Sequence, residues 1–181
     1  MKNSFYSQKE LEDLGLKKFG QNVLISRYAR LYSPELIEIG HDVRIDDFCI
    51  LSGDIKLGSY IHISAYSALY GRFGIEMEDY TGLSPRCTVF SASDDFSGEY
   101  LIGPMIDKKY TNVTGGKVLI KKYSQLGCNC VILPSVTINE GVAVGAMSLI
   151  IRDLDPWKIY LGSPARYVKE RSKGLLNAIA R

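Results

Sequence analysis

The sequence predicts an all-β protein, a parallel β-helix of hexapeptide repeats with short N- and C-terminal helices and a protruding mid-chain loop. Three observations lead to this fold class. A large apolar residue recurs every six residues over most of the chain, and sets of three hexads recur after 18 or 20 residues. The 3.6-residue period of an amphipathic helix occurs only near the two ends. These patterns divide the chain into a helical cap at 1–18, a β-helix at 19–166 with an inserted loop at 91–116, and a helix at 167–181.

The N-terminal cap is predicted from a helix-start signal. Ser7 and Glu10 have the spacing of a capping box, and Leu11 and Leu14 follow on one helical face. A stack of β-coils exposes unpaired strand edges at its ends, so we expect this helix to cover the first coil.

The repeat predicts a triangular prism. All 18 hexad starts are Ile, Leu, Val, Met or Phe, namely Phe19, Ile25, Leu31, Ile39, Ile45, Leu51, Leu57, Ile63, Leu69, Met77, Leu83, Val89, Ile120, Leu126, Ile132, Ile138, Val144 and Ile150. Four residues later the side chain is usually small or β-branched, as in Val23, Ala29, Val43, Cys49, Ser67, Thr81, Cys87, Ser124, Cys130, Val136, Val142 and Ser148. Both positions should point inward, so that stacked coils bury what one coil cannot. Glu35 and Phe73 break the rule beside two-residue bulges.

The repeat fails between Val89 and Ile120. Residues 91–116 are polar and rich in glycine and other turn-forming residues. A long insertion in a compact fold is usually functional, so we expect the loop to contribute to a site. Beyond the last coil, Tyr167 to Ala180 is predicted to form a second helix, weakened at Gly174, that caps the far end.

The composition is that of a globular protein. The 181 residues are 46% hydrophobic and 23% charged with a net charge of +2, which argues against a disordered chain and against nucleic-acid binding. No window approaches the ~18 apolar residues of a membrane span, and the N-terminus lacks the apolar core of a signal peptide. A cytoplasmic protein is the expectation.

The four cysteines predict free thiols. Cys49, Cys87 and Cys130 occupy inward corner positions, where a cysteine behaves as a small buried apolar residue. The pair Cys128-x-Cys130 lacks a second cysteine pair or a nearby histidine, so no metal site is expected.

Together with the hexads and the mid-chain loop, the segments 144–148 (Val-Gly-Ala-Met-Ser) and 162–166 (Gly-Ser-Pro-Ala-Arg) resemble the hexapeptide-repeat acyltransferases. Within them, the resemblance is to the galactoside and maltose O-acetyltransferase branch. It spans roughly residues 19–170. It implies a left-handed path, where the general crossover rule would favour a right-handed one. It also implies a homotrimer with active sites between neighbouring prisms, and acetyl-CoA as co-substrate.

The resemblance implies a set of positions for acetyl-CoA: Cys128, Gly145, Ala146, Ile151, Arg152, Arg166 and Lys169. The first three would line the pantetheine arm with backbone groups and small side chains. Ile151 and Arg152 would lie near the adenosine end. Arg166 and Lys169 are placed for the phosphates, which guanidinium and ammonium groups bind well. The alternative is that the three cations are solvated surface charges.

One departure concerns the catalytic base. The O-acetyltransferases carry a histidine soon after a proline-led coil, where this chain has Asp94 followed by Asp95. A sugar hydroxyl needs general-base help worth ~10²–10⁴ in rate. An amine with a pKa of about 8 is already about one-tenth neutral at pH 7. A carboxylate can orient such an amine and accept its proton. The acidic pair therefore favours an amine acceptor, with His62, the outward residue of its hexad, as the second candidate base.

The acidic pair favours an amine, and viosamine-type N-acetyltransferases resemble this chain in size. The function that this resemblance implies is acetyl-CoA-dependent N-acetylation of a nucleotide-linked (dTDP) amino sugar for surface polysaccharide or O-antigen synthesis. Sugar O-acetylation, with Asp94 or His62 as base, is the first alternative. A carbonic-anhydrase-like prism would need three zinc-binding histidines, and the chain has only His41 and His62. A non-catalytic scaffold would not need the acyltransferase-like C-terminal segment. Asp94 and Asp95 could also form a loop turn.

Outward aromatic residues support the expected homotrimer. The faces of the predicted prism still carry Tyr28, Tyr60, Tyr66 and Tyr70, a larger aromatic set than the surface of a monomer usually shows.

Overall fold

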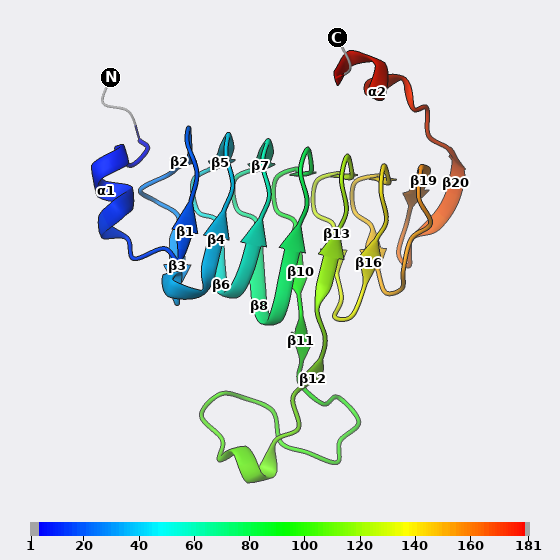
Figure 1. Cartoon of the computed structure of the whole chain (residues 1–181). Coiled ribbons are helices and arrows are strands. Elements are labelled where there is room, and N and C mark those ends of the chain that lie inside the picture. The colour runs from blue at the N-terminus through cyan, green and yellow to red at the C-terminus, as the bar shows by residue number, and fades with distance from the viewer. Residues whose placement is uncertain (1–3, 180–181) are drawn as a thin grey trace.

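The computed structural model describes residues 4–179, which wind into a three-sided prism of parallel strands (Figure 1). Successive coils lie side by side along the prism axis, and a single cluster of apolar side chains fills the interior. No helix among the described residues has the length and apolarity needed to cross a bilayer.

Each face of the prism collects one strand from each coil. The first face is an eight-stranded sheet of β2 (Leu24–Ile25), β5 (Val43–Ile45), β7 (Ile61–Ile63), β9 (Gly82–Leu83), β14 (Gln125–Leu126), β17 (Ala143–Val144), β19 (Lys158–Leu161) and β20 (Arg166–Glu170). All of these pairings are parallel except the last.

The other two faces form one ten-stranded sheet, because β6 (Ile50–Leu57) and β8 (Ala68–Met77) run unbroken around the corner between them. The second face holds their first halves with β3 (Arg30–Tyr32), β10 (Thr88–Phe90), β15 (Val131–Ile132) and β18 (Leu149–Ile150). The third face holds their second halves with β1 (Lys18–Phe19), β4 (Ile37–Ile39), β13 (Val118–Ile120) and β16 (Thr137–Ile138).

The inward positions predicted from the repeat are confirmed. Every hexad start is buried except Phe19 and Leu31, which are partly buried against the core, and all of the small corner residues are buried as well. The two exceptions to the rule point outward. Glu35 lies in the short 3₁₀ helix η1 (Pro34–Leu36), and Phe73 is 42% exposed where β8 turns the corner.

Glycines set the close approach of the coils at the corner between the third and first faces. A Cβ atom on Gly40 would lie 2.4 Å from the carbonyl oxygen of Gly58, and one on Gly20 would lie 2.6 Å from that of Gly40. Only glycine fits backbones this close. The recurrent glycine that follows an apolar residue in the sequence therefore marks a corner of the prism.

The N-terminal cap is built as predicted. Helix α1 (Gln8–Asp13) begins with a capping box in which the Ser7 hydroxyl accepts a hydrogen bond from the Glu10 amide and the Glu10 carboxylate accepts one from the Ser7 amide. Arg27 of the first coil donates to both Glu10 oxygens, at 2.7 and 2.6 Å. With Leu11 buried in the core, these contacts fix the helix over the end of the prism.

The C-terminal segment differs from the helix expected over 167–181. Residues 166–170 form β20, which pairs antiparallel with β19, and the described helix α2 covers only Gly174–Ile179. The strand is favoured because β19 would otherwise leave an open edge. Arg171 then fastens the chain to the prism by donating to the carbonyls of Tyr123, Gly141 and Val142. Residues 180 and 181 of the expected helix lie outside the described residues.

The mid-chain insertion leaves the prism at the corner between the second and third faces. Its stem is the antiparallel pair β11 (Ala92–Ser93) and β12 (Thr114–Gly115), and its outer part contains the 3₁₀ helix η2 (Lys108–Tyr110). The loop projects well away from the coils (Figure 1).

Replacing Leu69 by alanine should lower the free energy of unfolding by about 2–5 kcal/mol, because its side chain is fully buried and leaves a cavity. Urea titration measures the change. Leu101→Ala is the matched control, since Leu101 is 56% exposed in the loop and should change stability by less than about 0.5 kcal/mol. Equal losses in the two variants would contradict the assignment of the core.

The contact between α1 and the first coil should weaken in acid. Hydrogen bonds from Arg27 and Ser7 lower the pKa of Glu10 from 4.5 to about 2. A carboxyl group with a lowered folded-state pKa stabilises the fold above its unfolded pKa, and this contribution is lost as the pH falls toward the folded value. The stability difference between the wild type and Glu10→Gln should therefore be constant above about pH 5.5 and shrink toward about pH 2. Chemical unfolding across this range measures it, with Glu12→Gln as control. A difference independent of pH would refute this role for Glu10.

Candidate functional site

A cavity of about 490 Å³ lies where the mid-chain loop joins the prism. Ser93 and Asp94 line it from the stem, Arg72 from the corner of β8, and Lys108 from η2. The loop predicted to contribute to a site therefore does form a cavity, together with a residue of the preceding coil.

Ser91 holds the stem against β8. Its hydroxyl accepts a hydrogen bond from the amide of Phe73 at 2.9 Å and donates to the carbonyl of Tyr70 at 3.0 Å. The returning strand passes so close that a Cβ atom on Gly115 would lie 2.2 Å from the Ser91 carbonyl oxygen. The position of the stem relative to Arg72 is therefore fixed by backbone contacts.

The two adjacent aspartates have different surroundings. Asp95 accepts hydrogen bonds from the amide of Ser97 at 2.7 Å and from the side chain of Asn112 at 2.9 Å, which lower its pKa. Its carboxylate therefore holds the two halves of the loop together. Within residues 4–179, no side-chain hydrogen bond or ion pair involves the carboxylate of Asp94, which lines the cavity. Of the two aspartates, Asp94 is the one available to a ligand.

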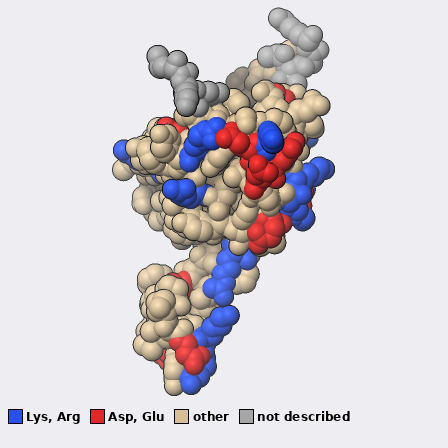
Figure 2. Space-filling model, turned by 90° about the vertical axis from the view of Figure 1, so that its left-hand side faces the viewer, with Lys and Arg blue, Asp and Glu red and all other residues tan. Residues whose placement is uncertain are grey.

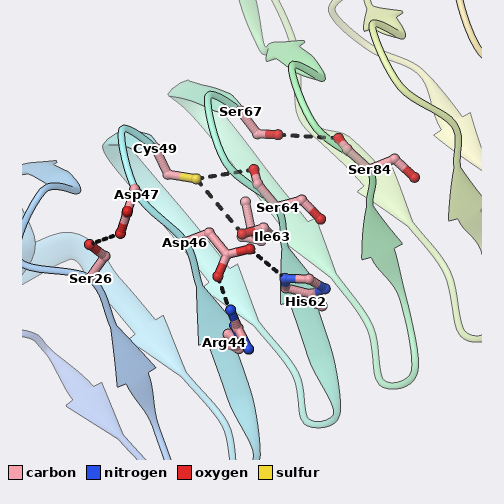
Figure 3. A network of polar contacts seen from close by, with 10 residues as sticks. All are labelled: Ser26, Arg44, Asp46, Asp47, Cys49, His62, Ile63, Ser64, Ser67 and Ser84. Carbon is pink, nitrogen blue, oxygen red and sulfur yellow. Dashed lines mark hydrogen bonds and ion pairs between the residues drawn. The ribbon is translucent and has the colours of Figure 1, made fainter. Parts of the chain in front are cut away.

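His62 lies on a different face. It belongs to β7 of the first face, and its Nε2 is 2.7 Å from Oδ2 of Asp46, whose Oδ1 accepts a hydrogen bond from Nε of Arg44 at 2.7 Å (Figure 3). Burial raises the pKa of Asp46, but the hydrogen bonds from Arg44 and His62 outweigh burial and lower it. His62 thus joins neighbouring coils in a surface network and does not line the loop cavity.

The predicted pantetheine positions lie along the corner between the first and second faces. The amide of Met147 donates to the carbonyl of Cys128 at 2.8 Å, which places Cys128 and Ala146 on adjacent coils. A Cβ atom on Gly127 would lie 2.6 Å from the Ala146 nitrogen. Gly145 lies beside the side chain of Leu161, since a Cβ atom on Gly145 would lie 2.5 Å from Cδ1 of Leu161. An unbranched chain bound here would run past Ala146, which is exposed.

The cations expected at the nucleotide end of acetyl-CoA are partly brought together. Arg152 and Arg166 line one cavity of about 280 Å³ with Tyr160 and Tyr167. Neither arginine forms an ion pair within the described part of the chain. Lys169 lies on β20, like Arg166, but it does not line this cavity. Ile151 precedes Arg152 in the sequence and is 47% exposed.

The inward cysteines are structural. Cys49, Cys87 and Cys130 are free and buried, as predicted, and burial raises the pKa of Cys49 to about 11. Cys128 is free and half-buried. In the described residues, no group of three or more His, Cys, Asp or Glu side chains is placed to hold a metal ion.

Three residues near these sites were not predicted from the sequence. Arg72 and Lys108 line the loop cavity, and Ser84 follows β9 in the same row as Gly127 and Gly145. The hydroxyl of Ser67 donates to the carbonyl of Ser84 at 3.4 Å (Figure 3). A signal for Arg72 existed in the sequence, because its neighbour Phe73 breaks the small-residue rule.

No family model matches the chain. The dTDP-4-amino-4,6-dideoxy-D-glucose acyltransferase of Escherichia coli is 38% identical over 176 residues, which cover 96% of this chain and 92% of that protein. AntD, an N-acyltransferase from Bacillus cereus, was solved as its D94N variant with dTDP and coenzyme A, and it matches with a TM-score of 0.96 and 51% identity over 98% of this chain and 97% of AntD. AntD was also solved as its S84C variant with dTDP-4-amino-4,6-dideoxyglucose and coenzyme A.

These matches extend over nearly the whole of each chain, so the likeness includes the loop and the caps as well as the repeat. The superposition on AntD also confirms the left-handed path, because coils of opposite hand do not superpose. The chain belongs to the hexapeptide-repeat acyltransferase family that includes AntD and the Escherichia coli dTDP-4-amino-4,6-dideoxy-D-glucose acyltransferase.

Proposed function

We propose that this protein transfers the acyl group of an acyl-CoA to the amine of a dTDP-linked 4-amino sugar. The observation that carries the proposal is Asp94, whose carboxylate has no partner within residues 4–179 and lines a cavity formed by the inserted loop. AntD was studied as a variant of an aspartate with the same number, in complex with dTDP and coenzyme A. With 51% identity over almost the full length, this agreement supports an equivalent position.

The chemistry of Asp94 suits an amine acceptor. A carboxylate binds the ammonium form of an amino sugar, orients it and takes up the proton that must leave before attack. The neutral amine then attacks the thioester carbonyl and forms the C–N bond. The C–S bond breaks, and the second proton lost from the nitrogen passes to the leaving thiolate, which departs as coenzyme A. A hydroxyl acceptor would need a stronger base, and no histidine lines this cavity.

Two chains are needed to complete the proposed site. Ser84, Cys128 and Ala146 lie near the corner that begins the second face, whereas Asp94 follows the corner that ends it. One side of the prism therefore separates the expected acyl-CoA groove from the acceptor cavity of the same chain. A neighbouring prism can bring its own loop to this groove, which supports the homotrimer expected from the sequence.

Two arginines near the C-terminal end of the prism fit the phosphates of coenzyme A. Arg152 and Arg166 line a common cavity and have no ion-pair partner among the described residues. We assign acetyl as the acyl group. Because AntD was solved with 3-hydroxybutyryl-CoA, the test also includes a longer acyl group. The proposed compartment is the cytoplasm, and the proposed use of the product is surface polysaccharide synthesis.

The amine specificity is tested with a matched pair of acceptors, dTDP-4-amino-4,6-dideoxyglucose and dTDP-6-deoxyglucose, which carries a hydroxyl in place of the amine. Release of free thiol from acetyl-CoA and from 3-hydroxybutyryl-CoA should occur with the first acceptor only. In Asp94→Asn, kcat/KM for the amine should fall by ~10-fold or more, about 1.4 kcal/mol, while the KM for acyl-CoA stays unchanged. His62→Asn, the control, should retain full activity. Full activity in Asp94→Asn together with loss in His62→Asn would overturn the proposal.

The shared site is tested by mixing two defective variants. Ala146→Trp should block acyl-CoA binding, which calorimetry measures, and Asp94→Asn impairs the acceptor side. After subunits are exchanged at equal ratio, about one interface in four combines an intact groove with an intact loop from its neighbour, so about a quarter of wild-type activity should return. Sedimentation should give about three times the 20.2 kDa chain mass. A monomer, or no recovery on mixing, would place both halves of the site in one chain.

A further inference from the structure

The loop cavity is lined by charged side chains of both signs that form no ion pair with the described residues. Arg72 and Lys108 line it together with Asp94, and no ion pair in the described residues involves any of the three. Neighbouring cations are neutralised, since Lys117 pairs with Glu76 at 2.6 Å and Lys109 pairs with Asp107 at 3.5 Å. Arg72, Lys108 and Asp94 thus remain available to a ligand of the cavity.

Arg72 is held in place by the base of the loop. Its guanidinium carbon lies 5.8 Å from the centre of the Phe73 ring, and the amide of Phe73 is bound by Ser91 at the start of the stem. A cation over an aromatic face keeps its outward N–H groups free for an anion.

Lys108 is placed by the loop's own turn. Asp107 accepts a hydrogen bond from the amide of Lys109 at 3.1 Å and so starts η2, while Thr111 donates to the carbonyl of Lys108 at 3.3 Å. Of the basic residues in 91–116, Lys108 lines the cavity and Lys109 does not. Figure 2 shows Lys and Arg atoms along one side of the projecting loop, from the prism towards its tip.

We infer that Arg72 and Lys108 bind the diphosphate of the acceptor, while Asp94 of the same cavity binds its amine. The inference rests on the proposed function and extends it to how the acceptor is selected. A nucleotide-linked amino sugar carries an anionic diphosphate on one side of the sugar ring and an ammonium group on the other. Two cations and one carboxylate line one cavity, so the cavity offers a charge of opposite sign to each of these two groups. Guanidinium and ammonium groups are the usual partners of phosphate oxygens, and a charge-assisted hydrogen bond to phosphate is about twice as strong as a neutral one.

Selection by these charges has a specific consequence. An amino sugar without the diphosphate would engage Asp94 alone and bind weakly. Arg72 and Lys108 therefore restrict acylation to activated, nucleotide-linked sugars, and free amino sugars are poor substrates. They are specificity residues rather than residues of the acyl-transfer chemistry.

The test crosses variants with acceptors. Arg72→Met and Lys108→Met remove the charge and keep an unbranched chain, and Lys109→Met is the matched control on the same 3₁₀ helix. Each is assayed with dTDP-4-amino-4,6-dideoxyglucose and with the methyl glycoside of the same amino sugar, which has the amine but no diphosphate. Binding of dTDP alone is measured by calorimetry, and acyl-CoA affinity and circular dichroism report on the groove and the fold.

We expect Arg72→Met and Lys108→Met each to lower kcat/KM for the nucleotide sugar by ~10-fold or more, chiefly through KM, and to weaken dTDP binding by a similar factor. Their activity on the methyl glycoside should equal that of the wild type, and Lys109→Met should match the wild type on both acceptors. Equal losses on both acceptors, or unchanged dTDP affinity, would overturn the inference and leave the proposed function intact. A wild type that acylates neither amine would refute the proposed function itself.

Discussion

Parallel hydrogen bonding between successive coils is the constraint on which the rest of this structure depends. Strands from consecutive turns pair residue for residue, so that Ile45, Ile63 and Leu83 follow one another along the first face. Because this register is fixed, residues at equivalent positions of each coil form straight rows. The same register stacks Tyr60 on Tyr80 at 4.6 Å, and it aligns Ser84, Gly127 and Gly145 in one row along the proposed acyl-CoA groove.

The register also explains how the chain tolerates a long insertion. Strand β10 before the loop pairs with β15, and β13 after the loop pairs with β8, so the coils on both sides remain aligned as if the insertion were absent. The coils thus provide a rigid frame for the proposed acyl-CoA groove, and the loop supplies the cavity proposed for the acceptor. Site residues carried by a frame of paired strands are held more accurately than residues on isolated loops, and here the stem and Ser91 join the loop to that frame.

Sequence periodicity predicted the prism, its buried positions and the N-terminal cap, because each depends on local pattern: an apolar residue every six, or a serine three residues before a glutamate. The cavity at the loop could also be anticipated, since the loop interrupts the repeat, and the candidate Asp94 lines it. Three features could not be predicted from the sequence. Strand β20 depends on an open edge of β19 and on the carbonyls that Arg171 reaches, both of which exist only in the folded chain. Arg72 and Lys108 are 36 residues apart in sequence and meet only because the loop folds back. Leu161 covers Gly145 from a later coil.

The closed base of the insertion bears on how such enzymes diversify. The amide of Ser91 donates to the carbonyl of Tyr70 at 3.0 Å, and the amide of Gly116 donates to the carbonyl of Ser91 at 3.0 Å, so the chain leaves and re-enters the prism at nearly the same point. For a loop whose ends already meet, the entropy of closure grows only with the logarithm of its length, about 0.6 kcal/mol for each doubling. Insertions and deletions between the two anchor points should therefore have little effect on the stability of the coils. Natural variation can therefore change the length and sequence of the loop, and with it the cavity proposed for the sugar, while the coils that carry the proposed acyl-CoA groove stay the same.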